Sequence, residues 1–250
     1  MSIYGLVYLL GFILSFIFFY KTSNTLSSLK LCLIMAIGAI LGGRLGYVLF
    51  YELAYYLKNP LEIIEIYKGG MSYHGGLIGL LGALYFYRQK DLFFILDKLV
   101  YVALIIIPLG RIANFLNGEL WGTISYLPWA VIFEDVDKFP RHPVQIYEAL
   151  AEGPLLYIFI KFCEKFSLSK GYCLVQGSRS AIYLIGYSLG RITCEIWREE
   201  DRMVGRFINE TLSLGQILCI IMLICGFILL YSRLKLSLRL KVRLPQKHSY

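Results

Sequence analysis

Long apolar stretches recur along nearly the whole chain and are separated by short polar segments. A helix needs about 20 residues to cross the hydrocarbon core of a membrane, and most of the stretches are close to that length. Pro108 and Gly110 interrupt the fourth stretch, and the third is short. The pattern predicts an all-α, polytopic integral membrane protein with about seven transmembrane helices, at roughly 3–20, 31–51, 74–88, 92–115, 144–162, 180–197 and 212–231.

Composition supports the membrane interpretation. The chain of 250 residues is 58% hydrophobic, 16% aromatic and only 17% charged, whereas charged residues make up about a quarter of a soluble domain. The first stretch lacks the basic start of a signal peptide and is followed by further spans, so we interpret it as the first helix. No internal repeat, low-complexity tract or linker is visible, which predicts one transmembrane domain over residues 1–250.

Lysine and arginine alternate between the loops in a way that predicts orientation. One set of loops, with the tail at about 232–250, is rich in basic residues, and the other set mixes them with many acidic ones. Basic loops stay in the cytoplasm, so the N-terminus is expected outside and the C-terminus inside. The net charge of +8 suggests anionic lipid rather than nucleic acid, because six basic residues crowd the tail: Arg233, Lys235, Arg239, Lys241, Arg243 and Lys247.

The longest loop, the cysteines and the histidines each allow a further prediction. The outer loop at about 118–141 contains tryptophan and proline and is expected to be an interfacial segment. The six cysteines form no C-x-x-C pair and are expected to be small buried hydrophobes. The histidines His74, His142 and His248 are too dispersed to indicate a metal site.

The first motif with candidate chemistry surrounds His74, in the sequence Gly-Gly-Met-Ser-Tyr-His-Gly-Gly-Leu-Ile-Gly over 69–79. Glycine lets a ligand approach the backbone, and a helix start offers free N–H groups to an anion. Histidine there could accept a proton near neutral pH. Alternatively, His74 caps the helix and the glycines serve helix packing.

The second motif runs from Gly110 to Gly122. If the helix continues, Arg111, Asn114 and Gly118 share one face. A guanidinium fork can hold a phosphate with two bonds, and an arginine at membrane depth normally faces a cavity with a partner. The alternative is an internal pair between Arg111 and Glu119.

The third motif, Gly190 to Arg198, places Arg191, Glu195 and Arg198 on one helical face by their spacing. A salt bridge through Glu195 competes here with direct chemistry, and we expect Glu195 to orient an arginine that touches substrate. Arg141, before a predicted helix that contains Glu148, and Arg44, inside the second span, could both be scaffolding. The charge-derived topology places the segments of His74, Arg111, Arg141 and Arg191 on the same outer side, which predicts a shared site.

At these residues the sequence resembles the bacterial phosphatidylglycerol–prolipoprotein diacylglyceryl transferase family. The pattern Arg-x-x-Asn-Phe-x-Asn-Gly-Glu-Leu-Trp-Gly stands at 111–122, and His-Gly-Gly-Leu-Ile-Gly stands at 74–79. Agreement extends to Tyr4-Gly-Leu, Gly42-Gly-Arg-Leu-Gly-Tyr, Arg141-His-Pro, and the spacing of Arg191, Glu195 and Arg198. The chain departs from the family at Glu199-Glu200-Asp201, where a proline is common, and its outer loop is short.

The resemblance implies an enzyme of the bacterial cytoplasmic (inner) membrane with its active site toward the non-cytoplasmic face. It would transfer the diacylglyceryl group of phosphatidylglycerol to the lipobox cysteine in a prolipoprotein signal peptide, without metal or cofactor. The implied catalytic residues are His74, Arg111 and Arg191. Those expected to bind phosphatidylglycerol are Tyr4, Gly75, Gly76, Arg111, Asn114, Asn117, Glu119 and Gly122. Residues expected to orient them without direct contact with the lipid are Arg141, Glu195 and Arg198.

Two other classes of protein are weighed against this enzyme. A transporter also has broken helices and buried arginines, but it predicts polar residues through the membrane thickness and a matching second half. A phospholipid transferase of the CDP-alcohol type needs an aspartate-rich metal motif within a helix. The sequence has no visible repeat and no such motif.

Overall fold

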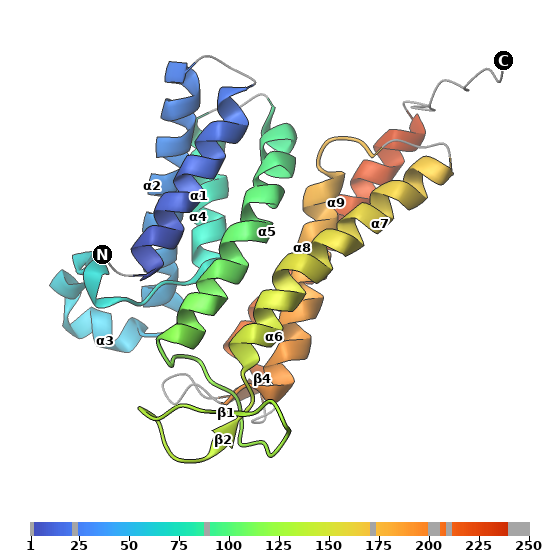
Figure 1. The fold of residues 1–250 in the computed structure, drawn as a ribbon. Coiled ribbons are helices and arrows are strands. Elements are labelled where there is room, and N and C mark those ends of the chain that lie inside the picture. The colour runs from blue at the N-terminus through green and yellow to red at the C-terminus, as the bar shows by residue number, and fades with distance from the viewer. Residues whose placement is uncertain are drawn as a thin grey trace. The chain divides into compact units, whose positions relative to one another are not determined.

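The structure, a computed structural model, describes residues 3–21, 25–87, 91–170, 174–199, 206–208 and 212–239. Most of these residues are helical (Figure 1). The chain divides into two compact units, each described by itself. Unit 1 comprises Met1–Tyr8, Phe93–Asp201 and Gly215–Tyr250, and unit 2 comprises Leu9–Leu92 and Arg202–Leu214. A single catalytic domain over 1–250 stays a prediction.

Unit 2 is built mainly on two helices that pack closely. These are α2 (Thr25–Phe50) and α4 (Tyr73–Phe86), and α1 (Ile3–Tyr20) contributes most of its length to the same unit. A methyl group on Gly75 would lie 2.4 Å from the carbonyl oxygen of Gly42 and 2.7 Å from Gly46 Cα. Only glycine allows this approach, as is common between membrane helices. The remaining elements are α3 (Leu53–Lys58), the 3₁₀ turns η1 (Pro60–Ile64) and η2 (Ile66–Lys68), and strands β3 (Arg206–Ile208) and β4 (Leu212–Ser213).

Arg44, whose burial in α2 required a partner, is surrounded by backbone carbonyl groups. Its guanidinium donates to the carbonyl oxygens of Glu62, Ile63 and Gly69 at 2.7, 2.9 and 2.6 Å, and it lies over the ring of Tyr56. The side chain is 4% exposed. Arg44 therefore fixes the segment that leads into α4, which is the scaffolding role considered for it.

Unit 1 contains most of the other helices: α5 (Leu92–Leu116), α6 (Val144–Leu150), α7 (Leu156–Ser169), α8 (Ser178–Cys194) and α9 (Leu214–Arg239). One π-helical turn, η3 (Ala151–Leu155), joins α6 to α7 without a break, and the 3₁₀ turn η4 (Glu195–Trp197) follows α8. The interruption predicted at Pro108 is wrong, because α5 continues through it. Helices in a membrane tolerate proline where neighbours satisfy the freed backbone groups.

A buried acid from α5 caps the start of α8. Asp97, 5% exposed, accepts hydrogen bonds from the backbone N–H groups of Gly177 and Ser180, both at 2.8 Å, and from the Ser180 hydroxyl at 2.7 Å. These donors belong to the first turn of α8, whose N–H groups have no partner within the helix. Asp97 therefore joins two helices that are distant in sequence.

Among the described residues, four helices are long and apolar enough to cross a membrane. They are α1, α2 from Leu26 onward, α5 and α9. The helix α4 has 14 residues and α8 has 17, and both lie where spans were predicted. The chain is therefore a multi-pass membrane protein, and the count of seven spans stays a prediction.

Short strands add a feature that the all-α prediction did not include. Strands β1 (Val131–Ile132) and β2 (Pro140–Arg141) pair antiparallel within the loop at 118–141, as β3 and β4 do in unit 2. Strands of two or three residues are too short for a visible alternation of apolar and polar positions. The fold is mainly helical all the same.

Candidate active site

Six charged side chains from three helical segments meet in the interior of unit 1. They are Arg111 of α5, Glu148 of α6, Glu152 of η3, Arg191 of α8, and Glu195 and Arg198 just after α8. We call these six residues the arginine–glutamate network. The three arginine side chains are 10–14% exposed, and those of Glu148 and Glu152 are 0% exposed. Equal numbers of the two charges allow such a group to be buried.

Glu148 is the centre of the network. One of its oxygens, Oε1, accepts from Arg191 Nη1 at 2.7 Å and from Arg198 Nη1 at 3.1 Å. The other, Oε2, lies 2.9 Å from Arg111 Nη1. One carboxylate thus brings together three arginines that are far apart in sequence.

Arg111 and Arg191 each have a second carboxylate. Arg111 holds Glu152 with both branches of its fork, from Nε at 2.8 Å and from Nη2 at 2.9 Å. Arg191 forms an ion pair with Glu195, as its spacing predicted. Among the described residues, every ion pair of Arg191 and Arg198 uses Nη1, so no carboxylate in this part of the chain pairs with their Nε and Nη2 groups.

A second polar group surrounds the carboxylate of Glu119. The hydroxyl of Tyr4 donates to Glu119 Oε2 and accepts from Asn114 Nδ2 at 2.7 Å. Asn114 and Asn117 also donate to Glu119, each at 3.3 Å. Gln145 of α6 donates to the Glu119 carbonyl at 2.6 Å. The structure thus brings together four of the residues expected to bind phosphatidylglycerol: Tyr4 of α1, Asn114 of α5, and Asn117 and Glu119, which follow the end of α5.

The loop at 118–141 is joined to the residues that follow α8, beside the arginine–glutamate network. Arg141, 7% exposed, donates to the Gly122 carbonyl at 3.0 Å, to Glu199 at 3.0 Å and to Asp137 at 2.6 Å. Gly122 pairs with Arg198 in an isolated β-bridge. Arg141 therefore positions the loop through which Gly122 reaches Arg198, and it belongs to the structure around the site.

Gly122 has no room for a side chain. A Cβ there would lie 2.6 Å from both Cβ and the carbonyl oxygen of His142. We expect Gly122→Ala to push the loop away from α6 and to lower the midpoint of thermal unfolding, since overpacking costs about 1–3 kcal/mol. The matched variant Gly110→Ala, whose Cβ meets no atom within 4 Å, should leave this midpoint unchanged. Equal behaviour of the two variants would contradict the steric explanation.

The ion pair between Asp137 and Arg141 predicts acid sensitivity of the loop. The Arg141 guanidinium, followed by the Phe139 N–H, lowers the pKa of the Asp137 carboxyl below its ordinary value near 3.8. A lowered pKa stabilises the fold above the ordinary value, and that contribution is lost as the pH falls through the lowered one. Asp137→Asn should therefore lower the unfolding temperature at pH 7, and this effect should shrink as the pH falls below the ordinary value of 3.8 and through the lowered pKa. Asp135→Asn, for which no partner is present among the described residues, serves as control, and a pH-independent effect of Asp137→Asn would refute the pairing.

His74, the predicted base, lies in the first turn of α4 in unit 2. The helix is capped by Ser72, whose hydroxyl accepts from the Gly75 N–H at 3.2 Å, so the alternative in which His74 is the cap is wrong. The ring of His74 is half-buried and packs edge-on against Tyr73 at 5.4 Å. Gly75 serves helix packing, which was the alternative for the glycines. At Gly76 a Cβ would meet Ala39 O at 3.3 Å and Gly43 Cα at 3.9 Å. Lipid binding by Gly75 and Gly76 stays a prediction.

Three local expectations from the sequence need correction. The helix α5 ends at Leu116, so Gly118 lies beyond it with φ of +64° and does not share a helical face with Arg111. The helix α8 ends at Cys194, and Arg198 is extended, so the arginine reaches the network from a loop. The alternative pairing of Arg111 with Glu119 is also wrong, because Arg111 pairs with Glu148 and Glu152.

The sequence interpretation missed the glutamates that organise the network. Glu148 was noted only as part of a possible scaffold, and Glu152 was not considered. Both are acids within a predicted span, where a charged residue is costly and usually has a partner. That signal alone would have identified Glu152, and also Asp97.

Known proteins resemble this chain over nearly its full length. The sequence profile described as prolipoprotein diacylglyceryl transferase matches residues 1–232. The chain belongs to this family. Three proteins named phosphatidylglycerol–prolipoprotein diacylglyceryl transferase are similar to it. The one from Polynucleobacter asymbioticus is 46% identical over 197 residues, which are 78% of this chain and 73% of that protein.

The other two relatives match over more of the chain. The protein from Methylobacillus flagellatus is 41% identical over 247 residues, 93% of this chain and 92% of its own. The protein from Aliivibrio fischeri is 36% identical over 253 residues, 97% of this chain and 89% of its own. As a member of the prolipoprotein diacylglyceryl transferase family, the chain is a transferase, and the transporter and CDP-alcohol interpretations are not supported.

Proposed function

We propose that this chain transfers the diacylglyceryl group of phosphatidylglycerol to the lipobox cysteine of prolipoproteins. The cysteine sulfur forms a thioether bond with the glycerol carbon of the lipid, and the bond from that carbon to the phosphate oxygen breaks. Glycerol phosphate leaves, and the thiol loses its proton. The observation that carries the proposal is the arginine–glutamate network in a chain that belongs to the family.

The departing phosphate requires positive charge that is fixed in advance, because stabilisation of developing charge is the largest contribution to many catalysed reactions. Arg111 and Arg191 both form ion pairs with the Glu148 carboxylate, which holds them in place. The Nε and Nη2 groups of Arg191 would bind the phosphate, and Arg198 would add a further guanidinium. Glu148, Glu152 and Glu195 act as positioning residues that keep the arginines in their orientation.

The polar group around Glu119 would bind the glycerol headgroup. A carboxylate held by Tyr4, Asn114 and Asn117 offers acceptors to hydroxyl groups, and the amides can donate to them. Within this group, Asn114 follows Arg111 on α5 by about one helical turn. This spacing supports one headgroup site with a phosphate end and a glycerol end.

His74 is proposed as the base that removes the thiol proton, since the thiolate is the nucleophile in thioether formation. Replacement by glutamine keeps a hydrogen-bonding side chain without a titrating ring. We expect His74→Gln to lower the rate by about 10²-fold or more, the usual contribution of general-base catalysis. Transfer to a lipobox peptide would be measured from pH 6 to 9. A variant that keeps the full rate throughout this range would rule out the general-base role.

The membrane placement is part of the same proposal. Seven spans would be formed by α1, α2, α4, α5, the continuous segment of α6, η3 and α7, then α8 and α9. Loop charges favour an outer N-terminus, a cytoplasmic tail and an active site on the outer face of the cytoplasmic membrane. The proposed partners are phosphatidylglycerol, other membrane lipids and the prolipoprotein signal peptide with its lipobox cysteine, and no metal or cofactor enters the reaction.

The activity is tested with the purified full chain, phosphatidylglycerol and a synthetic lipobox peptide. Mass spectrometry should detect a peptide heavier by one diacylglyceryl group, with one glycerol phosphate released for each product. A peptide whose cysteine is replaced by serine provides the control and should remain unmodified. Absence of product in correctly folded protein would overturn the proposed function.

A further inference from the structure

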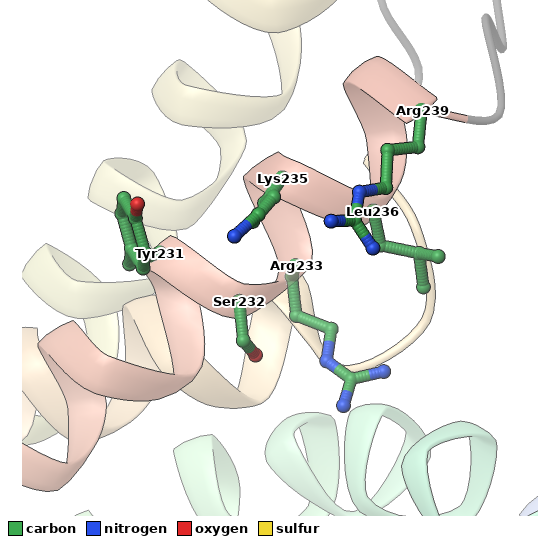
Figure 2. Close-up of a pocket in the computed structure, with 6 residues that line it drawn as sticks. All are labelled: Tyr231, Ser232, Arg233, Lys235, Leu236 and Arg239. Atoms are coloured by element: carbon green, nitrogen blue, oxygen red, sulfur yellow. The ribbon is translucent and has the colours of Figure 1, made fainter.

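A basic cleft lies at the end of α9, in a part of unit 1 that the proposed reaction does not use. It has a volume of about 420 Å³ and is lined by Tyr231, Ser232, Arg233, Lys235, Leu236 and Arg239 (Figure 2). Pockets for small ligands commonly measure about 300–1,000 Å³. Three of the six lining residues are cationic, and none is acidic. The cleft therefore favours an anion.

The spacing of the lining residues explains how one helix forms the cleft. Tyr231, Lys235 and Arg239 recur every four residues, so they lie one above another on a single face of α9. Lys235 and Arg239 are exposed. Figure 2 shows both side chains on the helix surface beside Ser232 and Leu236. Two cations one helical turn apart can contact the same group.

Arg233 differs from Lys235 and Arg239 because its side chain is held in place by packing. Its guanidinium carbon lies 3.6 Å from the ring centre of Phe93, and its Cδ would lie 3.2 Å from a Cβ atom added at Gly177. The Nε atom is buried and has no hydrogen-bond partner among the described residues. A buried donor without a partner is destabilising, and an anion acceptor would relieve this cost. No ion pair is present among the described residues for Arg233, Lys235 or Arg239.

We propose that this cleft binds a phosphate group. A phosphate offers acceptors to the guanidinium groups of Arg233 and Arg239 and to the ammonium of Lys235, and the Tyr231 hydroxyl can donate as well. The phosphate can come from the headgroup of an anionic phospholipid or from a free phosphate ester such as glycerol phosphate. The position of the cleft at the end of a long apolar helix, where lipid headgroups lie, fits either source.

General attraction between basic residues and anionic lipid is the competing explanation. Long basic side chains near helix ends extend to the interface and attract anionic lipid wherever they stand. That explanation predicts equal effects for any two lysines or arginines at this end of unit 1. A phosphate site predicts that only the residues lining the cleft matter.

The test compares two double variants that each remove two positive charges. Lys235→Gln with Arg239→Gln alters the cleft, and Lys165→Gln with Lys170→Gln alters the end of α7, where both lysines are exposed. Purified full chain would be titrated with short-chain phosphatidylserine and, separately, with glycerol phosphate. Native mass spectrometry and the shift of the thermal unfolding midpoint report binding. Compared with the wild type, the cleft variant should bind at least one of these probes about tenfold or more weakly. The α7 variant should bind the same probe less than about twofold more weakly.

Each outcome has a defined meaning. A loss confined to phosphatidylserine supports the site and identifies lipid as the source, and a loss for glycerol phosphate supports the site with a free phosphate ester as the source. Equal losses in the two variants, or no loss in either, would overturn the proposal. Because the transfer reaction is not the readout, the result is independent of the proposed function.

Discussion

Glu148→Gln is expected to abolish transfer activity and to destabilise unit 1. The carboxylate contacts Arg111, Arg191 and Arg198, and its side chain is completely buried. The neutral amide would leave three arginines close together with one negative charge fewer between them. Removing one partner of a buried ion pair costs about 3–5 kcal/mol, and here three pairs share that partner. The measurements are the rate of transfer to a lipobox peptide and the unfolding midpoint in detergent.

Glu164→Gln is the matched control for this variant. Glu164 of α7 also holds two cations, Lys161 at 2.9 Å and Arg179 at 2.5 Å, but it lies outside the network. Its loss should cost less stability, since both cations are more exposed and such pairs contribute about 0–1 kcal/mol, and activity should be retained. Glu148→Gln protein that unfolds and reacts like the wild type would show that Glu148 does not organise the site.

Arg111→Lys is expected to lower kcat/KM by about 10²-fold or more, even though it keeps the positive charge. Lysine cannot reproduce the fork that holds Glu152 from Nε and Nη2 while Nη1 contacts Glu148. Loss of a single group that stabilises developing negative charge commonly costs about 10²–10³ in kcat. Steady-state transfer kinetics on purified enzyme provide the measurement, and near-normal turnover would refute the phosphate role of Arg111.

A double-variant cycle distinguishes two roles of Arg111: contact with the phosphate of the substrate and contact with Glu152, which joins two helical segments. Glu152→Gln removes the carboxylate that the Arg111 fork contacts, while the contact with Glu148 stays. If Arg111 acts only as a scaffold for Glu152, the double variant should react no more slowly than the worse single variant. A further loss on adding Arg111→Lys is expected, because the phosphate contact is lost in addition. Arg179→Lys, at the other ion pair, should leave kcat/KM unchanged.

The helices were predictable from the sequence because apolar length alone determines them. The first helix, predicted at 3–20, is Ile3–Tyr20, and the fourth span, predicted at 92–115, is Leu92–Leu116. The signal is strong because a helix is the simplest way to satisfy every backbone group in a membrane. The interruption expected at Pro108 is absent, because a membrane helix tolerates proline where neighbouring groups satisfy the freed backbone groups.

The sequence indicated most residues of the site, but it predicted only some of the contacts between them. Spacing placed Arg191 beside Glu195 because both lie on one helical turn. The contacts of Arg111 with Glu148 and Glu152 join α5 to α6 and η3, and no spacing within one helix encodes them. The π-helical turn at Ala151–Leu155, which carries Glu152, has no periodic signal in the sequence, and such turns are frequent at functional sites.

The most direct test of the account is an experimental structure with a phosphatidylglycerol analogue bound in place of the lipid substrate. The account predicts that the phosphate lies within hydrogen-bond distance of Arg111 and Arg191 and that the glycerol headgroup contacts the polar group around Glu119. A phosphate bound away from both arginines, with the arginine–glutamate network unchanged, would contradict it.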